Sequence, residues 1–244
     1  MTSYTAPEII YPESDGLPLA DNTIQFRCIT TIVGGIAGIY QDNPNVFVAG
    51  DLFWYPKQRQ PWVKQAPDVV VVFGRPQGDR RSYKQWEEDD IPPQVVFEIA
   101  SASNTITELE VTKLEFYSEY GVQEYYVYDP DSGRLKGWLR QGEIMTPIEV
   151  MEGWVSPQLG IRFEKEDKEL QVYRPDGERF GTYVEILEQK EREATARQEA
   201  ERERDLIAQQ QQEAIPRLLG MGLTAEQISD ALSSPLQIVQ KFID

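Results

Sequence analysis

The sequence predicts an α/β or α+β fold, in which a mixed β-sheet is flanked by helices and followed by a C-terminal helical extension. Three observations predict it. Short apolar runs such as DVVVVF (68–73) and VVFEI (95–99) are typical of buried strands. Helical patterns separate some of these runs, whereas the turn signal PDSG (130–133) joins two others into an antiparallel hairpin. A long charged stretch then follows residue 180.

The elements of the sheet region follow one another along the chain. After a Pro-rich, turn-like stretch at 1–20, a helix is expected from Asn22 or Thr23, both good N-caps, to about Tyr40. Strands are then expected at 46–54, around 61–65 and at 68–73, and a polar loop at 74–93. The strand that carries Glu98 follows, and after it a helix from about Ile106 to Tyr120 that ends at Gly121. A strand at 122–129 and a hairpin at 134–149 complete the sheet region.

The chain is expected to divide into three parts. Residues 1–180 form the mixed-sheet domain, residues 181–214 a long charged helix, and residues 215–244 a small helical tail. Heptads counted from Val184 are apolar only in the first turns, so a solvated single helix or a weak contact between chains is favoured over a strong coiled coil.

The tail resembles a small helix-turn-helix. Two capping boxes are expected, Thr224 to Gln227 and Ser234 to Gln237. Because Arg217 and Lys241 are its only basic residues, contact with DNA is less favoured than contact with a protein partner.

Composition excludes several classes of chemistry. The chain has no histidine, and Cys28 is its only cysteine, so it can form neither an internal disulfide nor a zinc site of the usual Cys/His type. Catalysis through a Ser-His-Asp or Cys-His arrangement is excluded as well. The net charge of −17 is unusual for a protein that binds nucleic acid, in which basic patches supply most of the affinity.

Nothing in the sequence predicts a membrane segment. The N-terminus lacks the basic and apolar regions of a signal peptide, and the apolar stretch at 28–40 is too short to span a bilayer. A cytoplasmic protein without a membrane partner is therefore expected.

Two carboxylates stand out because they occupy strand-like apolar runs. Asp68 opens one run and Glu98 lies within another. If the two strands pair, both carboxylates meet at one end of the sheet, where their repulsion at about 4 Å is roughly 4 kcal/mol at an effective dielectric constant near 20. A divalent cation would remove that cost, and ligands that are all oxygen favour Mg²⁺ or Mn²⁺.

Lys113 is the third candidate. With Leu109, Phe116, Tyr117 and Tyr120 it shares one face of the second expected helix, which is otherwise apolar, so its ammonium could reach back to the Glu98 strand. Structural readings stay open for each residue alone: Asp68 as a turn cap, Glu98 as a buried acid paired with Lys113, and Lys113 as a surface residue.

These residues resemble a known pattern. The stretches APD (66–68), FEIAS (97–101) and YGVQEYYVYDP (120–130), with Lys113 four residues before Tyr117, are similar to the Uma-two family of predicted endonucleases in the PD-(D/E)XK restriction-endonuclease-like superfamily. The resemblance spans about residues 20–180. It implies a restriction-endonuclease-like core, Mg²⁺-dependent hydrolysis of phosphodiester bonds in nucleic acid, with DNA as the expected substrate, and, for members that cut both strands, a homodimer.

The resemblance also assigns the residues. Asp68 matches the first acid of the motif and Glu98 the second. Ala100 stands where the motif has its lysine, but in this family the lysine is thought to have moved to the following helix, where Lys113 matches.

Two functions follow from this sequence. The first is a Mg²⁺- or Mn²⁺-dependent endonuclease in which Asp68 and Glu98 hold the metal and Lys113 takes part in catalysis. The second is a non-catalytic module of nuclease fold that recruits a protein partner through residues 184–244. The acid pair favours the first function, and the net charge of −17 favours the second.

Overall fold

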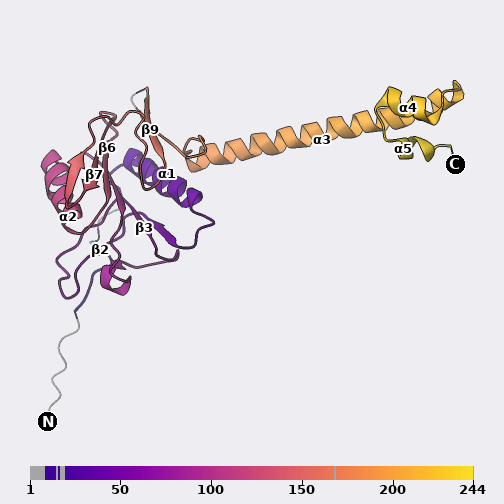
Figure 1. Cartoon of the computed structure of the whole chain (residues 1–244). Coiled ribbons are helices and arrows are strands. Elements are labelled where there is room, and N and C mark those ends of the chain that lie inside the picture. Colours follow the sequence, from indigo (N-terminus) through magenta and orange to yellow (C-terminus); the bar gives the residue numbers. More distant parts are fainter. Residues whose placement is uncertain (1–8, 15, 17–19, 168, 244) are drawn as a thin grey trace, which may run out of the picture. The chain divides into compact units, whose positions relative to one another are not determined.

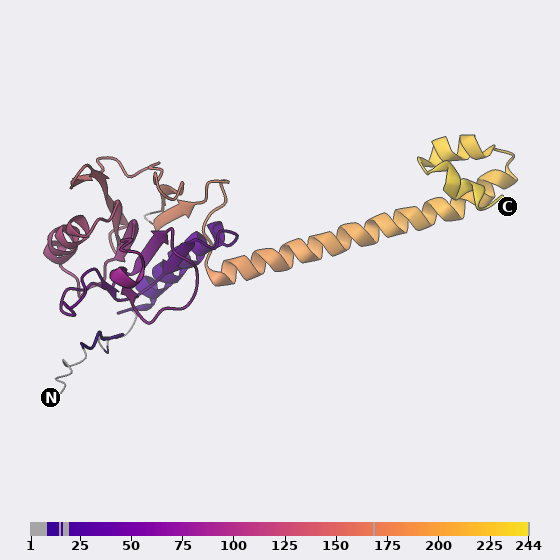
Figure 2. The same cartoon turned by 60° about the horizontal axis from the view of Figure 1, so that its bottom comes forward.

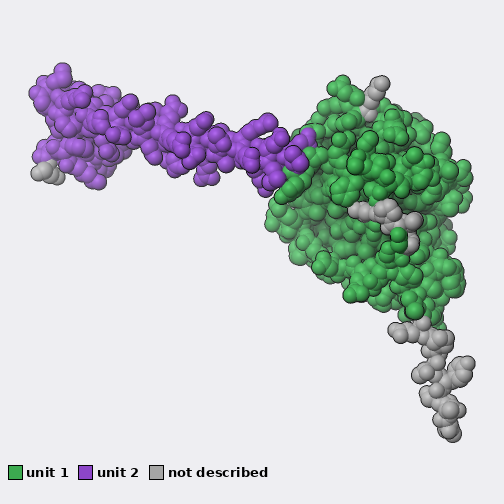
Figure 3. Space-filling model, turned by 180° about the vertical axis from the view of Figure 1, so that it is seen from behind, with its two compact units in different colours: residues 1–183 green, residues 184–244 purple. Residues whose placement is uncertain are grey.

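The computed structural model describes residues 9–14, 16, 20–167 and 169–243, so most of the turn-rich prediction for residues 1–20 lies outside the described residues. The chain forms two compact units, residues 1–183 and residues 184–244, coloured separately in Figure 3. The candidate site belongs entirely to the first unit.

The first unit is built on a six-stranded mixed sheet in the order β1-β3-β5-β6-β7-β8 (Figure 1). Its strands are β1 (Val46–Ala49), β3 (Val69–Phe73), β5 (Val95–Ile99), β6 (Glu124–Asp129), β7 (Arg134–Gln141) and β8 (Ile144–Pro147). Only β5 and β6 run parallel, because the chain crosses over between them through a helix, and all other neighbours in this sheet are antiparallel. The predicted mixed sheet with flanking helices is therefore confirmed.

Each face of the sheet carries its own apolar cluster. On one face, α1 (Thr23–Ile39) lies across β1, β3 and β5 (Figures 1 and 2), and a hairpin of β9 (Arg162–Glu166) and β10 (Glu169–Tyr173) completes the cover. On the other face lie α2 (Lys113–Glu119) and a short parallel pair, β2 (Trp54–Tyr55) with β4 (Tyr83–Lys84). The even-numbered positions of β5, including Glu98, belong to the α2 face, because side chains alternate along a strand.

Helix α1 begins as predicted. The Asn22 side chain accepts a hydrogen bond from the Gln25 backbone N–H, which caps the helix. Near its other end the helix packs closely on Phe180, since a Cβ atom added at Gly35 would lie 2.3 Å from the Phe180 ring. Phe180 is the last buried side chain of the unit along the chain.

Several strand predictions were wrong in extent. The strand predicted at 46–54 ends at Ala49, because Gly50 lies against the Asp68 carbonyl and Asp51 adopts a left-handed backbone conformation with φ of 48°. The segment 61–65 is not a strand, and only Gln65 forms a bridge, with Trp54. The sequence reasoning missed β9 and β10, and it treated 74–93 as a loop although β4 and a 3₁₀ turn (Gln85–Glu87) lie within it.

The second predicted helix contains an irregular turn. Glu108–Thr112 form a π-helix that continues directly into α2, and the helix ends at Tyr120, after which Gly121 adopts φ of 94° as predicted for its position. The Lys113 backbone N–H donates to the Glu108 carbonyl across this wider turn.

The second unit consists of α3 (Tyr183–Gly220), α4 (Ala225–Leu232) and α5 (Leu236–Gln240). Helix α3 runs six residues beyond the predicted end at 214 and continues through Pro216, and it is exposed from Val184 to Gln210. Ile215, Ile228 and Val239 form a small buried cluster of their own. None of the described helices has both the length and the apolar character that crossing a membrane requires.

One of the two capping boxes is present. Thr224 and Gln227 bond reciprocally at the start of α4. The predicted box at Ser234 is wrong, because Pro235 itself is the N-cap of α5 and no side chain caps that helix. The division of the chain into three domains, with boundaries at 180 and 214, stays a prediction.

Candidate active site

Strand pairing sets the two predicted acids opposite each other. In the antiparallel pair of β3 and β5, Val69 lies opposite Phe97 and Val70 opposite Val96. Continuing this register by one residue places Asp68 opposite Glu98. Paired positions in adjacent strands have Cα atoms about 4.5–5.5 Å apart, so the structure brings the two carboxylates together at one end of the sheet.

Asp68 is held by the backbone of the neighbouring strand. Its Oδ2 atom accepts a hydrogen bond from the Ile99 N–H at 2.6 Å. Burial, together with the nearby Glu98 carboxylate, nevertheless raises the pKa of Asp68 to about 8, whereas the Ile99 hydrogen bond and the Lys113 ammonium act in the opposite direction. When no metal ion is bound, the Asp68 carboxyl group therefore holds a proton near neutral pH.

Glu98 is the buried member of the pair, with 2% of its surface exposed. Lys113 Nζ donates to its Oε2 at 2.9 Å, and the Tyr117 hydroxyl donates to its Oε1 at 2.5 Å. Both donors come from α2, where residues four apart lie on the same side of a helix. Each oxygen of this buried carboxylate thus has a partner, as a buried charge requires.

The Lys113 ammonium keeps its proton in this site. Burial alone would lower the pKa of Lys113, but the charge of Glu98 and the hydrogen bond to it raise the pKa above its ordinary value, and Asp68 adds to this effect. The site thus combines a cation, a carboxylate and a carboxyl group that becomes anionic only when its proton is removed.

Two tyrosines complete the surroundings, and sequence reasoning assigned no role to either. Tyr117 and Tyr125 are both fully buried. The Tyr125 hydroxyl donates to the Leu109 carbonyl, within the π turn, at 2.8 Å. Burial and the charge of Glu98 raise the pKa values of both hydroxyls above the ordinary value for tyrosine, so both remain hydrogen-bond donors at neutral pH. The four-residue spacing from Lys113 to Tyr117 was the sequence signal that could have identified the donor to Glu98.

The acid pair offers the ligand chemistry that a hard divalent cation requires. Asp68 and Glu98 offer carboxylate oxygens at one end of the sheet, and a bound cation would stabilise the ionised form of Asp68, whose pKa is raised by burial and by the Glu98 charge. Among the described residues, no group of three or more His, Cys, Asp or Glu side chains is placed to hold a metal ion. The protein would therefore supply two carboxylates, and water or substrate oxygens would supply the remaining ligands.

Another buried acid lies on the opposite face of the sheet and has a structural role. Glu124, at the start of β6, is fully buried and accepts hydrogen bonds from Tyr126, Ser156 and the Gln158 backbone. Three donors satisfy this carboxylate and attach the segment after β8 to the sheet, so it is not available for chemistry.

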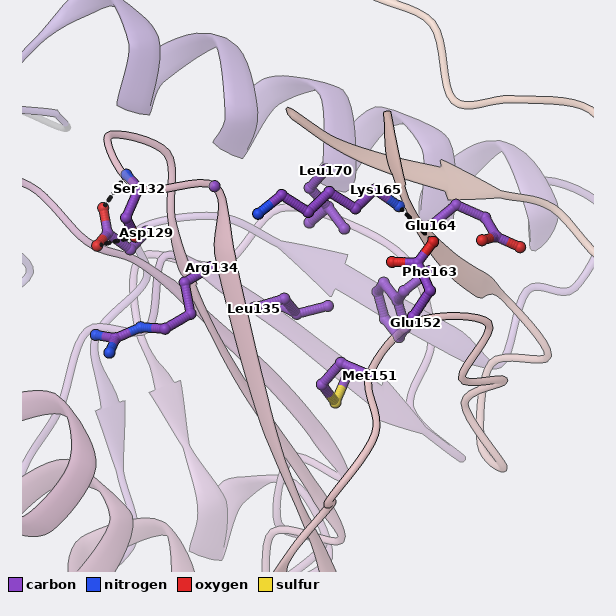
Figure 4. A pocket seen from close by; sticks show the side chains of 11 residues that line it. Asp129, Ser132, Arg134, Leu135, Met151, Glu152, Phe163, Glu164, Lys165 and Leu170 are labelled. Carbon is purple, nitrogen blue, oxygen red and sulfur yellow. Dashed lines mark hydrogen bonds between the residues drawn. The ribbon is translucent and has the colours of Figure 1, made fainter. Parts of the chain in front are cut away.

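A cavity of about 550 Å³ lies apart from these residues (Figure 4). Apolar side chains such as Leu135 and Met151 form part of its wall, and its polar groups carry both signs of charge, Lys165 and Arg134 together with Glu152 and Glu164. Asp68, Glu98 and Lys113 do not line it. The acid pair therefore lies outside this cavity.

The chain is similar to a known protein family and to a solved structure. Residues 25–206 match the family Uma2, described as "Putative restriction endonuclease". A crystal structure of "a putative nuclease belonging to DUF820 from Anabaena variabilis" is similar with 15% sequence identity and a TM-score of 0.38, over 55% of this chain and 69% of that chain. No curated protein matches the chain.

Proposed function

Since the chain belongs to the family Uma2, described as "Putative restriction endonuclease", we propose that it is a Mg²⁺- or Mn²⁺-dependent endonuclease that hydrolyses phosphodiester bonds in DNA. The observation that carries the proposal is the register of β3 and β5. It sets Asp68 opposite Glu98 while Lys113 contacts Glu98 from the covering helix.

Asp68 and Glu98 would hold the metal ion. A bound Mg²⁺ or Mn²⁺ supplies a water of lowered pKa and stabilises negative charge on the phosphate. Asp68 must release its proton to act as a ligand, and its pKa of about 8 means that this release accompanies metal binding near neutral pH. Tyr117 holds Glu98 in one orientation through its Oε1 atom.

Lys113 would contribute the positive charge of the reaction. Its Nζ atom lies 2.9 Å from Glu98, within reach of a water or phosphate oxygen bound beside that carboxylate. In this position it orients the attacking water or neutralises the charge that develops on the phosphate. The π turn before Lys113 supports this role, because such turns are frequent at functional sites.

The experiment is the nicking of supercoiled plasmid by the full chain with Mg²⁺, with Mn²⁺ and with EDTA. Nicking is expected only with a divalent metal, and Asp68→Asn and Glu98→Gln should each abolish it. A matched control is Glu152→Gln, which changes an acid in the separate cavity and should leave nicking intact. Equal nicking by the Asp68→Asn chain would contradict the proposal.

A second function is favoured by one observation on the second unit. Ile215, Ile228 and Val239 give residues 184–244 an apolar cluster of their own, whereas most of α3 is exposed. A nuclease-fold module that recruits a protein partner through this unit is the alternative. Absence of metal-dependent nicking in the native chain would favour it, and nicking that persists after removal of residues 184–244 would assign catalysis to the first unit alone.

A further inference from the structure

One segment of the first unit carries a positive net charge, although the chain as a whole is acidic. Residues 52–67, called here the acid-free segment, contain no Asp or Glu and carry Lys57, Arg59 and Lys64, in a chain whose net charge is −17. A local cationic segment is what an acidic protein requires to attract a polyanion.

The acid-free segment begins and ends beside the acid pair. Asp68 follows it directly, and at its base the Asp51 N–H donates to the Pro67 carbonyl at 3.1 Å. Two further backbone hydrogen bonds, at 2.8 and 3.2 Å, join Trp54 and Gln65. The segment therefore leaves and rejoins the sheet region beside Asp68, and its β2 part packs on the face that carries Glu98.

Contacts with other parts of the unit hold the segment in a defined shape. Lys57 pairs with Glu119 at 3.3 Å and lies 4.9 Å from the centre of the Tyr120 ring, which ties the segment to the end of α2. The Arg59 backbone N–H donates to the Tyr11 hydroxyl at 2.5 Å, and Arg59 adopts a left-handed conformation with φ of 65°. A non-glycine residue in that conformation is strained, and such strain is concentrated at functional sites.

The segment presents an aromatic ring and cations to solvent. Trp62 is 74% exposed, although tryptophan is usually buried for most of its surface. Arg59 is exposed and has no ion-pair partner among the residues that the structure describes. Lys64 is half-buried, with its ammonium 3.8 Å from the centre of the Phe53 ring, and no ion pair joins it to a carboxylate in the described part of the chain.

We propose that the acid-free segment binds single-stranded nucleic acid and delivers it to the acid pair, with Trp62 stacking on a base and Arg59 and Lys64 contacting phosphates. An aromatic ring that is free on the surface can stack only on a base whose face is accessible, which favours a single strand over a duplex. Lys57 positions the segment against α2, the helix that carries Lys113. The proposal rests on the nuclease function proposed above and specifies the form of its substrate.

The test measures binding separately from cleavage. Binding of a labelled oligodeoxythymidine of roughly 20 nucleotides, and of a duplex of the same length, is followed by fluorescence anisotropy with the full chain in EDTA, over a range of salt concentrations. The variants are Trp62→Ala and the double variant Arg59→Gln/Lys64→Gln. The matched controls are Ile144→Ala, an exposed apolar side chain on β8, and Lys165→Gln/Lys190→Gln, which removes two charges elsewhere.

Trp62→Ala should weaken binding of the single strand about 10-fold or more and change duplex binding by less than about twofold. The double variant should reduce the slope of log affinity against log salt by about 1.4, the value for two phosphate contacts on a single strand. Trp62 fluorescence should also be quenched when the single strand binds. Both controls should bind as the native chain does.

Single-strand binding by Trp62→Ala at native affinity, or an unchanged salt slope in the double variant, would overturn the proposal. If the native chain still nicks plasmid with a divalent metal, the nuclease function is supported and the acid-free segment has no part in substrate binding. Binding that depends on the segment, in a chain that with Mg²⁺ or Mn²⁺ cleaves neither the plasmid nor the single-stranded oligonucleotide, would instead support the segment and refute the nuclease function. A native chain that neither binds nor cleaves would refute both.

Discussion

Lys113 and Glu98 form a partly buried ion pair, with Nζ 2.9 Å from Oε2 and with 13% and 2% of the two side chains exposed. Removing one member of such a pair leaves the other charge buried without its partner, which typically costs about 3–5 kcal/mol. A metal ion that binds Glu98 would take over the role of that partner. The effect of a metal ion on the stability of a chain that lacks Lys113 therefore distinguishes a structural role of this lysine from a catalytic one.

The Lys113→Met chain should therefore be destabilised by about 3 kcal/mol in EDTA and recover most of that loss in Mn²⁺. It should nevertheless lose the plasmid nicking that the native chain shows in Mn²⁺. Urea unfolding with and without Mn²⁺, together with nicking by the same sample, tests this. Lys165→Met, which removes an exposed lysine, is the control and should behave as the native chain. Residual nicking alongside a stability loss that Mn²⁺ does not repair would assign Lys113 a structural role only.

Because of Asp68, the free energy of unfolding should decrease as pH rises, which is the reverse of the usual effect of an aspartate. Its pKa of about 8 in the folded chain lies above the value of about 3.9 for an unfolded aspartate. Between these two values the folded state holds a proton that the unfolded state has lost. In EDTA the free energy of unfolding should therefore decrease as pH rises from about 5 to about 8, by at most about 1.4 kcal/mol per pH unit.

Asp68→Asn should abolish this slope, because an amide does not ionise but can still accept the Ile99 hydrogen bond. Asp129→Asn is the control. Burial alone would raise the pKa of Asp129, but hydrogen bonds from Ser132 and Asp131 lower it, so it titrates below this pH range. Urea unfolding at several pH values measures both. A native chain whose stability stays constant across the range would show that Asp68 is ionised throughout it.

The Tyr117 hydroxyl should be needed to orient the Glu98 carboxylate for metal binding. Tyr117→Phe removes a donor to a buried carboxylate and should destabilise the chain by about 1–3 kcal/mol in EDTA. Because Glu98 is then less well oriented, Mn²⁺ affinity measured by calorimetry should fall as well. Tyr125→Phe is a close control, since this equally buried hydroxyl donates to a backbone carbonyl. Its Mn²⁺ affinity should remain at the native value, and an equal loss in both variants would argue against a specific role of Tyr117.

The first unit should fold without α3, provided that Phe180 is kept. A chain that ends at Thr182 retains the Phe180 ring against Gly35 and should unfold cooperatively with the same Tm as the first unit of the native chain. A chain that ends at Glu178 lacks the ring and should be less stable by about 3–5 kcal/mol. Both chains lack α3, so the comparison isolates residues 179–182, of which Phe180 is the buried one. Circular dichroism during heating tests it, and aggregation of the longer truncation would show that α3 is needed for folding.

Much of the fold could be predicted from sequence because local patterns and packing agree. The runs 68–73 and 95–99 are apolar enough to define β3 and β5, and the carboxylates within them indicated the acid pair. Lys113 was found because it interrupts an apolar helical face. In each case one periodic pattern determined both the element and the side of it that is buried.

The details that failed depend on contacts between distant residues. The π turn at 108–112 has no characteristic composition. Its Leu109 carbonyl accepts a hydrogen bond from the Tyr125 hydroxyl, which belongs to β6. Strand β1 was predicted too long because the left-handed backbone at Asp51 has no sequence marker beyond Gly50. The capping box at Ser234 failed because the Ser234 backbone N–H, which Gln237 would have to bind, donates to the Ser229 carbonyl instead.

The π turn before Lys113 has a consequence for how related sequences should be aligned. A π turn contains one residue more than an α-helical turn, and each residue of an α-helix turns the chain by about 100°. Deleting one residue within 108–112 would leave the lysine in the sequence but rotate it by about 100° relative to the preceding turn. A one-residue gap at this place would therefore separate relatives that can form this ion pair from those that cannot, even where every aligned sequence has a lysine.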